Sequence, residues 1–167
     1  GAQARVYLFV ATLPFSRYAF VEPTVDMRQE AWLRAHVAMF EFFGGTVPRI
    51  VPDNLKTGVI SHPREGEVVL NDAYRELAGH YSAAAQLATW VIAGLRSETF
   101  TTLSGLQARI RERVDAYNTT PFQKREGSRR SVFASEERPL LGTLPAAPFE
   151  ISQWVYGRKV GRNGHVV

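Results

Sequence analysis

The fold is decided by residues 6–22, which read VYLFVATLPFSRYAFVE. Residues 6–13 form a nearly continuous run of β-branched and aromatic side chains, and residues 17–22 alternate polar with apolar side chains. A short Pro-Phe-Ser segment separates the two runs. The segment therefore predicts two antiparallel strands, at 5–13 and 16–22, joined as a hairpin, with the first strand buried on both faces.

The chain after this hairpin predicts helices and one more strand. Asp26 precedes Gln29 by three residues, the spacing of a capping box, so we expect a helix over 26–43 that ends at Gly44. A short apolar run predicts a third strand at 49–52 in the same sheet. Further helices are expected at 71–81, at 86–96 and from Ser104 onward. This order of strands and helices predicts a mixed α/β layer fold.

The helix expected from Ser104 combines an apolar stripe with a charged surface. Gln107 stands where it would complete a capping box with Ser104. The stripe consists of Leu106, Ile110, Val114 and Tyr117. Three arginines fall outside the stripe and are expected to face solvent or DNA: Arg109, Arg111 and Arg113.

Composition limits the class of protein. The 167 residues suffice for one domain of ordinary size, and the absence of cysteine excludes a disulfide framework and a thiolate metal site. No apolar run approaches the roughly 18 residues that a membrane span needs.

Residues 105–130 hold seven Lys and Arg against three Asp and Glu, so their net charge of +4 equals the net charge of the whole chain. This excess predicts a polyanionic partner such as nucleic acid, with a solvated helix face as the alternative.

Asp53 is the candidate catalytic or metal-binding residue. It follows the strand expected at 49–52 and precedes Asn54, so its carboxylate has two interpretations. It accepts backbone N–H groups in an Asx turn, or it binds a hard cation such as Mg²⁺. Arg49 and Lys56 flank it and are suited to orienting a phosphate backbone. The four histidines lack the spacing of a metal site, and no Gly-rich phosphate loop is present.

Four segments in the same order resemble the IstA-type insertion-sequence transposases of the retroviral-integrase-like superfamily. These segments are residues 8–18, 40–45, 51–58 and 121–130. The resemblance implies an RNase H-like mixed sheet with flanking helices, followed by the start of a small β unit. The implied division is a partial catalytic core at 1–120, a basic and Pro-containing connector at 121–148, and the beginning of a C-terminal β domain at 149–167.

The same resemblance implies a DDE reaction, in which three carboxylates hold two Mg²⁺ or Mn²⁺ ions and DNA ends are cleaved and joined. Asp53 takes the place of the second carboxylate. The first and third carboxylates have no counterpart in this sequence. The nearest acids do not match the motif; they are Asp72, Glu76 and Glu98. We therefore expect the chain to be inactive by itself.

Two explanations for the missing carboxylates stay open. The chain is a fragment of a complete transposase, or it is a truncated or decayed copy that acts as a non-catalytic DNA-binding or assembly module. We favour the fragment, because loss of a central strand would expose the ladder groups of both neighbouring strands.

The remaining expectations concern partners. The implied partners are transposon ends and target DNA, a second copy of the chain and an AAA+ ATPase helper, with no membrane, in the bacterial cytoplasm. The residues expected to contact DNA are Arg49, Asn54, Lys56, Arg109, Arg113, Lys124, Arg125, Arg129 and Arg130.

Overall fold

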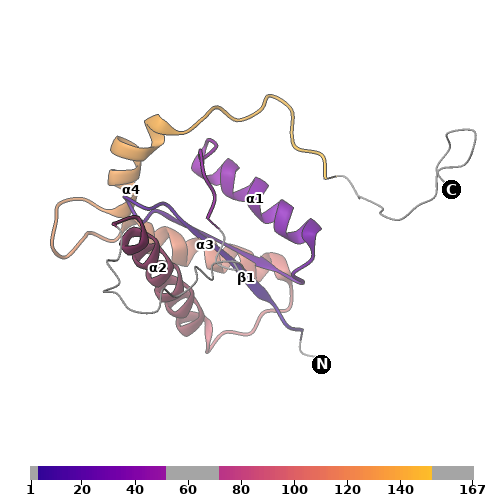
Figure 1. Ribbon diagram of the computed structural model, residues 1–167. Coiled ribbons are helices and arrows are strands. Elements are labelled where there is room, and N and C mark those ends of the chain that lie inside the picture. Colours follow the sequence, from indigo (N-terminus) through magenta and orange to yellow (C-terminus); the bar gives the residue numbers. More distant parts are fainter. Residues whose placement is uncertain (1–3, 52–71, 152–167) are drawn as a thin grey trace, which may run out of the picture.

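A two-stranded antiparallel hairpin covered by helices on both faces forms the centre of the molecule (Figure 1). This computed structural model describes residues 4–51 and 72–151, and of residues 72–82 it describes the backbone. The elements are β1 (Tyr7–Thr12), β2 (Ala19–Thr24), α1 (Gln29–Phe43), α2 (Asp72–Leu95), α3 (Leu103–Thr119) and α4 (Arg129–Val132). A π-helical turn (Phe133–Glu137) and a 3-10 turn (Arg138–Leu140) follow α4 directly.

The predicted hairpin is confirmed. β1 and β2 pair antiparallel with Val10 opposite Val21, and the backbone N–H of Leu13 donates to the carbonyl of Tyr18 at 3.0 Å. The turn places Arg17 at a φ of 62°. In the turn, the backbone N–H of Tyr18 donates to the hydroxyl of Ser16 at 2.9 Å.

The expectation that the first strand is buried on both faces is wrong. Residues Ala19, Phe20 and Val21 of β2 are buried, whereas residues 7–11 of β1 are half-buried. The reason is tertiary, because α3 packs against β2 and α1 contacts β2 more extensively than β1, which α2 covers from the other face. Strand composition alone carries no information about which strand the helices cover.

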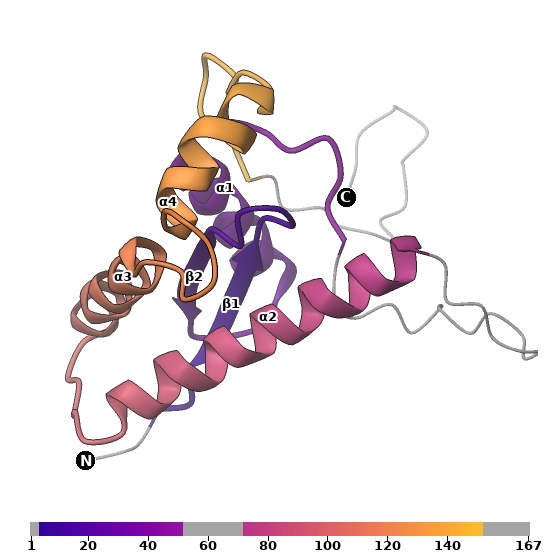
Figure 2. The same ribbon diagram turned by 90° about the vertical axis from the view of Figure 1, so that its left-hand side faces the viewer.

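Alternate residues of the hairpin enter two separate hydrophobic clusters. Phe20 and Leu13 pack with Met39 and Phe43 of α1, and Val21 packs with the helices on the opposite face. That second cluster consists of Ala19, Val21, Leu87, Val91, Ile110 and Val114. Figure 2 shows α2 crossing the face of the hairpin away from α1. The described residues thus form helix, sheet and helix layers, which confirms the mixed α/β class.

The predicted helix starts differ from those observed. α1 begins at Gln29 after Arg28, without a side-chain cap, and the carboxylate of Asp26 accepts the N–H of Arg28 at 2.9 Å. Asp26 thus forms a local turn before the helix, so the capping box with Gln29 is wrong. The expected end is confirmed, because Gly44 adopts a φ of 75° and its N–H donates to the carbonyl of Phe40 at 2.9 Å.

The cap of α3 also differs from its prediction. Thr102 is the N-cap, and its hydroxyl accepts the N–H of Gly105 at 3.1 Å. The predicted box of Ser104 and Gln107 is wrong, because the Gln107 amide donates to the carboxylate of Glu22. The apolar stripe is confirmed, with Ile110 and Val114 buried.

The helices expected at 71–81 and 86–96 form one continuous helix, α2. Ser-Ala-Ala-Ala joins the two predicted segments. Because alanine is the strongest helix former and neither proline nor glycine interrupts this stretch, the helix continues through it. The prediction of two helices is wrong for this reason.

The strand expected at 49–52 is not formed over its described part, residues 49–51. The sheet of residues 4–51 and 72–151 has two strands, and residues 48–51 are exposed. Thr46 instead forms an isolated bridge with Gly142, with N–H to O distances of 2.8 and 2.9 Å. Prolines at 48 and 52 remove two of the N–H donors that a ladder would need.

The segment expected to be an extended connector is helical over 129–140. The ring of Phe133 is buried and stacks on Tyr18 with centroids 4.3 Å apart. The carboxylate of Glu137 accepts the backbone N–H groups of Phe15 at 3.0 Å and Ser16 at 3.1 Å. These contacts attach the segment to the turn of the hairpin. The domain boundaries after residues 120 and 148 stay predictions. Most of the predicted small β unit, residues 152–167, lies outside the described residues.

Asn118 closes the outer edge of β2. Its side-chain oxygen accepts the N–H of Ala19 at 2.9 Å, its amide donates to the carbonyl of Ala19 at 2.8 Å, and it is fully buried. Asn118→Leu, which is close in volume, should lower the free energy of unfolding by about 2 kcal/mol, because both backbone groups lose their partners.

Urea denaturation followed by circular dichroism measures this change. Gln86→Leu, at an exposed position of α2, is the matched control and should shift stability by less than about 0.5 kcal/mol. Equal effects of the two substitutions would contradict the role of Asn118.

Candidate nucleic-acid interface

The candidate metal ligand lies outside the described part of the chain. Asp53, Asn54 and Lys56 fall in residues 52–71, whereas Arg49 is described and exposed on the segment after α1. Within residues 4–51 and 72–151 there is no group of three His, Asp or Glu residues that could hold a metal ion. The assignment of Asp53 as a metal ligand stays a prediction.

The arginines of α3 are engaged within the molecule. Arg109 forms ion pairs with Glu98 at 3.0 Å and with Glu112 at 2.9 Å. The hydrogen bonds to these two carboxylates, that to Glu98 first, raise the pKa of Arg109 above its ordinary value. Arg111 lies 3.8 Å from the carboxylate of Glu22. Arg109 is therefore not free, whereas the Arg111 side chain is exposed and faces solvent as expected.

Arg113 also makes intramolecular contacts, with α2. Its guanidinium lies 4.2 Å from the centroid of the Trp90 ring and donates to the Trp90 carbonyl at 3.2 Å. Gly94 permits this approach, because a Cβ there would overlap the guanidinium. Arg113 is thus held against α2, and no carboxylate of the described residues pairs with it.

A tight loop over 121–128 presents the next two cations. Pro121 and Ser128 form an antiparallel bridge, and the N–H of Phe122 donates to the carbonyl of Gly127 at 2.9 Å. Gly127 closes the loop with a φ of 86°, a conformation that favours glycine. The side chains of Lys124 and Arg125 are exposed on this loop.

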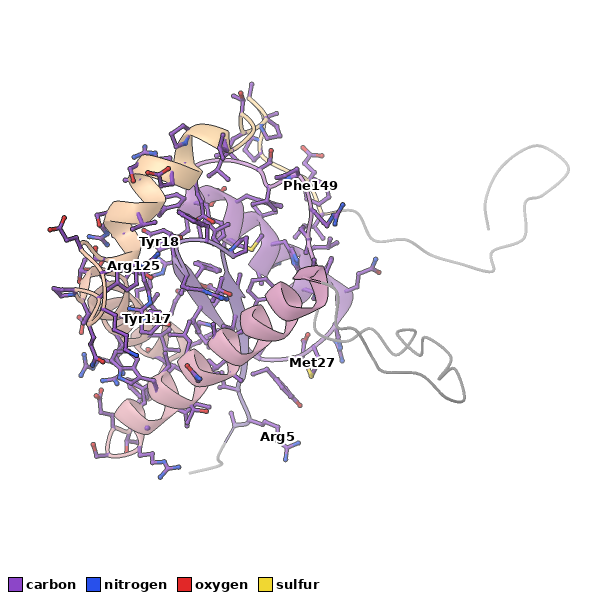
Figure 3. The ribbon with its side chains drawn as sticks, turned by 60° about the vertical axis from the view of Figure 1, so that its left-hand side comes forward. Arg5, Tyr18, Met27, Tyr117, Arg125 and Phe149 are labelled. Atoms are coloured by element: carbon purple, nitrogen blue, oxygen red, sulfur yellow. The ribbon has the colours of Figure 1, made fainter. Side chains whose placement is uncertain are left out.

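Arginine guanidinium groups and aromatic rings form a continuous series of contacts between α2 and this loop. We call this group the arginine–aromatic stack; it consists of Trp90, Arg113, Tyr117, Arg129, Phe122 and Arg125. The Trp90 and Tyr117 rings are 5.8 Å apart, and the Arg129 guanidinium lies 3.7 Å from the Tyr117 centroid. Arg129 is also 5.5 Å from the Phe122 centroid, and Arg125 lies 3.9 Å from it. Figure 3 shows Tyr117 and Arg125 on the same side of the molecule.

The last two sequence-predicted cations differ in their surroundings. Arg129 is half-buried and donates to the carbonyl of Tyr117 at 3.1 Å. Arg130 forms an ion pair with Asp115. Of the predicted DNA-binding residues, the structure therefore brings together Arg113, Lys124, Arg125 and Arg129, and it leaves Arg49 on a separate segment.

The sequence alone does not reveal the aromatic members of the stack, because the spacing of Tyr117 places it in the apolar stripe of its helix. The signal that could have indicated the stack is the interleaving of rings and cations over residues 117–129. Arg125 follows Phe122 by three residues, and Arg129 follows Arg125 by four.

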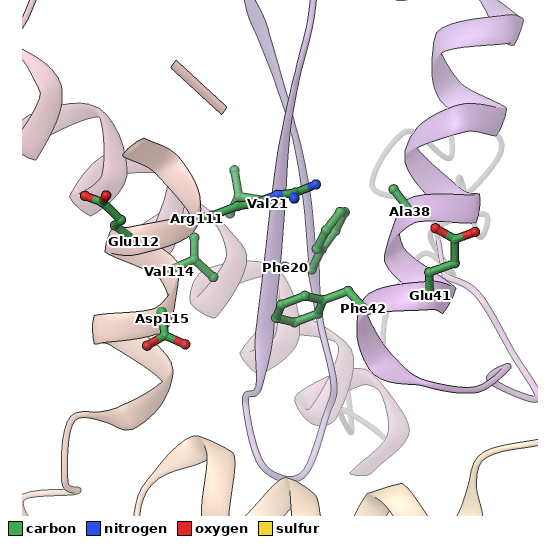
Figure 4. Close-up of a pocket in the computed structure, with 9 residues that line it drawn as sticks. All are labelled: Phe20, Val21, Ala38, Glu41, Phe42, Arg111, Glu112, Val114 and Asp115. Carbon is green, nitrogen blue, oxygen red and sulfur yellow. The ribbon is translucent and has the colours of Figure 1, made fainter. Parts of the chain in front are cut away.

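A concavity lies between α1 and α3, beside β2 (Figure 4). Its volume is about 660 Å³, and Phe20 and Phe42 line it from the hairpin and from α1. Its charged residues are three acids and one base, Glu41, Glu112, Asp115 and Arg111. This acidic lining would repel a phosphate backbone, so we exclude the concavity from the candidate interface.

Comparison with known proteins agrees with the resemblance stated above. A Pseudomonas fluorescens protein named "Putative transposase for insertion sequence IS1162" is 33% identical over 90% of this chain and 30% of its own length. A Mycobacterium tuberculosis protein, also named a transposase, is 33% identical over 96% of this chain and 43% of its own length. This chain is similar to insertion-sequence transposases.

The Pseudomonas aeruginosa transposase of insertion sequence element IS21 is 36% identical over 49% of the chain and 21% of its own length. The chain thus spans less than half the length of these curated relatives. No family model matches it. None of the described helices is long and apolar enough to cross a membrane.

The pKa of Glu22, a residue of β2, can be tested through the pH dependence of stability. Burial raises the pKa of Glu22, and the Arg111 charge and the Gln107 hydrogen bond oppose this rise. A carboxyl group whose pKa is higher in the folded chain than in the unfolded chain destabilises the fold at pH values above its pKa in the folded chain. This penalty decreases as the pH falls and is absent below the pKa of the group in the unfolded chain.

Glu22→Gln should therefore be more stable than the natural chain at pH 7 and lose this advantage at about pH 4 and below. Denaturation at a series of pH values measures the difference, with exposed Glu136→Gln as the control. A Glu22→Gln advantage that does not vary with pH would contradict the raised pKa.

Proposed function

We propose that this chain is the DNA-holding part of an insertion-sequence transposase core, and that a DNA backbone lies along the C-terminal end of α3, the 121–128 loop and α4. The similarity to transposases over nearly the whole chain supports a DNA-processing role. The basic excess of residues 105–130 supports the position of the DNA.

The observation that carries this proposal is the pattern of ion pairs. Carboxylates pair with Arg109, Arg111 and Arg130. Among residues 4–51 and 72–151, no carboxylate pairs with four other cations of the segment, namely Arg113, Lys124, Arg125 and Arg129. The uncompensated positive charge therefore gathers at the arginine–aromatic stack and the 121–128 loop. Uncompensated Lys and Arg supply the sequence-independent affinity for phosphate backbones.

The chemistry that we propose for the whole protein is the DDE reaction that the sequence resemblance implies, with Asp53 as one of its carboxylates. The acids of the described residues do not assemble a metal site, so we derive no metal-dependent step from them. Glu98 is paired with Arg109 and is not a substitute for the missing third carboxylate. A second copy of the chain and an AAA+ ATPase helper are the further partners that we propose.

Removal of two exposed loop cations tests the position of the DNA. Lys124→Ala combined with Arg125→Ala should weaken binding to a blunt duplex. The plot of log affinity against log salt should lose about 1.8 units of slope, because two phosphate contacts are lost. Fluorescence anisotropy at several salt concentrations measures both quantities.

The control is Arg28→Ala combined with Arg34→Ala, which removes two exposed cations at α1. This control variant should change the affinity for the duplex only through the net charge of the protein, and the slope of log affinity against log salt should stay nearly unaltered. An unchanged slope in the loop variant would mean that the 121–128 loop is only a solvated surface.

Asp53→Asn tests the chemistry in a full-length transposase that contains this chain. Mg²⁺-dependent cleavage and joining of transposon ends should be lost, because the neutral amide binds the cation weakly, whereas duplex affinity in EDTA should be retained. Gel analysis of labelled ends measures the products, and Asp26→Asn is the control.

The 167-residue chain alone should give no cleavage under the same conditions, since it contains one matching carboxylate. Cleavage by the chain alone would show that another acid completes the site. Cleavage by the full-length Asp53→Asn protein would exclude Asp53 from the mechanism.

A further inference from the structure

The arginine–aromatic stack ends in a guanidinium that is open to solvent. The Tyr117 ring, the Arg129 guanidinium and the Phe122 ring follow one another, and Arg125 lies over Phe122 at 3.9 Å as the outermost member. Arg125 is exposed, and within the described residues it has no carboxylate partner. One face of its guanidinium is covered by the ring, so the other is available to a planar ligand.

The loop that carries Arg125 is held in place before any ligand arrives. The bridge from Pro121 to Ser128 and the hydrogen bond from Phe122 to Gly127 close its base. Ser128 and Ser131 cap α4 reciprocally, with N–H to Oγ distances of 3.2 and 2.8 Å. Because the platform is pre-formed, a ligand that stacks on it orders few additional groups.

The surroundings of Arg125 suit a nucleotide. An open concavity at this loop includes Gln123, Lys124 and Arg125 in its lining, together with the stack members Phe122 and Arg129. Lys124 supplies a point charge for a phosphate, and the Gln123 amide supplies a donor and an acceptor for the edge of a base. The guanidinium face supplies a stacking surface, which base planes use on arginine as on aromatic rings.

We propose that the outer face of Arg125 stacks an unpaired base of DNA while Lys124 binds the adjacent phosphate. This inference rests on the proposed DNA-holding function and adds to it a preference for unpaired nucleotides. Bases in the interior of a duplex are paired and stacked on both faces, so an unpaired base for this platform comes from a single-stranded tail or a frayed end.

Three DNA probes test the site with the full chain by fluorescence anisotropy. They are a blunt duplex, the same duplex with a short single-stranded tail, and that tailed duplex with abasic nucleotides in the tail. The abasic tail keeps every phosphate and lacks the bases. The natural chain should bind the base-bearing tail about five-fold or more tightly than the abasic tail, the effect of one stacked base.

Arg125→Lys separates stacking from charge, because lysine keeps the positive charge and lacks the planar guanidinium. This variant should bind the base-bearing tail and the abasic tail alike, because the two tails carry the same phosphates and differ only in their bases. Arg138→Lys, a change at another exposed arginine, is the control and should keep the preference for the base-bearing tail.

The outcomes separate this site from the proposed function. Equal binding of the base-bearing and abasic tails by the natural chain, with duplex binding intact, would overturn the stacking site alone. The same conclusion follows if Arg125→Lys keeps the preference. Absence of binding to all three probes would overturn the DNA-holding function and the stacking site together.

Discussion

The register of the hairpin, with Val10 opposite Val21, is the constraint on which the other contacts depend. A two-stranded ribbon is at best marginally stable in water, so both of its faces must be covered. The register sends Phe20 toward α1 and Val21 toward α2 and α3. A slip of one residue would exchange the two sets of side chains and place each against the wrong helices.

The outer edge of β2 connects this core to the candidate interface. Asn118 satisfies both backbone groups of Ala19, and Pro23 has no N–H to offer a further strand. Pairing of this edge with other chains is thereby discouraged. The same two hydrogen bonds fix the C-terminal end of α3 on the sheet, which places the adjacent Tyr117 beside Arg129 and the 121–128 loop.

The distribution of carboxylates decides which cations are available to an anionic partner. Glu98 and Glu112 neutralise Arg109, and Glu22 lies near Arg111, whereas aromatic rings support Arg125 and Arg129. A ring holds a guanidinium in position without cancelling its charge. The stack therefore holds its guanidinium groups in position while their positive charge stays available to an anionic ligand. Ion pairs with carboxylates would hold the same groups but would neutralise that charge.

The sequence by itself determined the hairpin, the end of α1 at Gly44 and the apolar stripe of α3, because each follows from a local pattern of side chains. It also carried the similarity to transposases and the basic excess of residues 105–130. Only the tertiary structure decided that β2 is the more buried strand and that Gln107 bonds to Glu22. It also decided that α3 contributes Tyr117 and Arg113 to the candidate interface while its Arg109 pairs with carboxylates. These outcomes depend on groups far apart in the sequence: 85 residues separate Gln107 from Glu22, and no local propensity records such a contact.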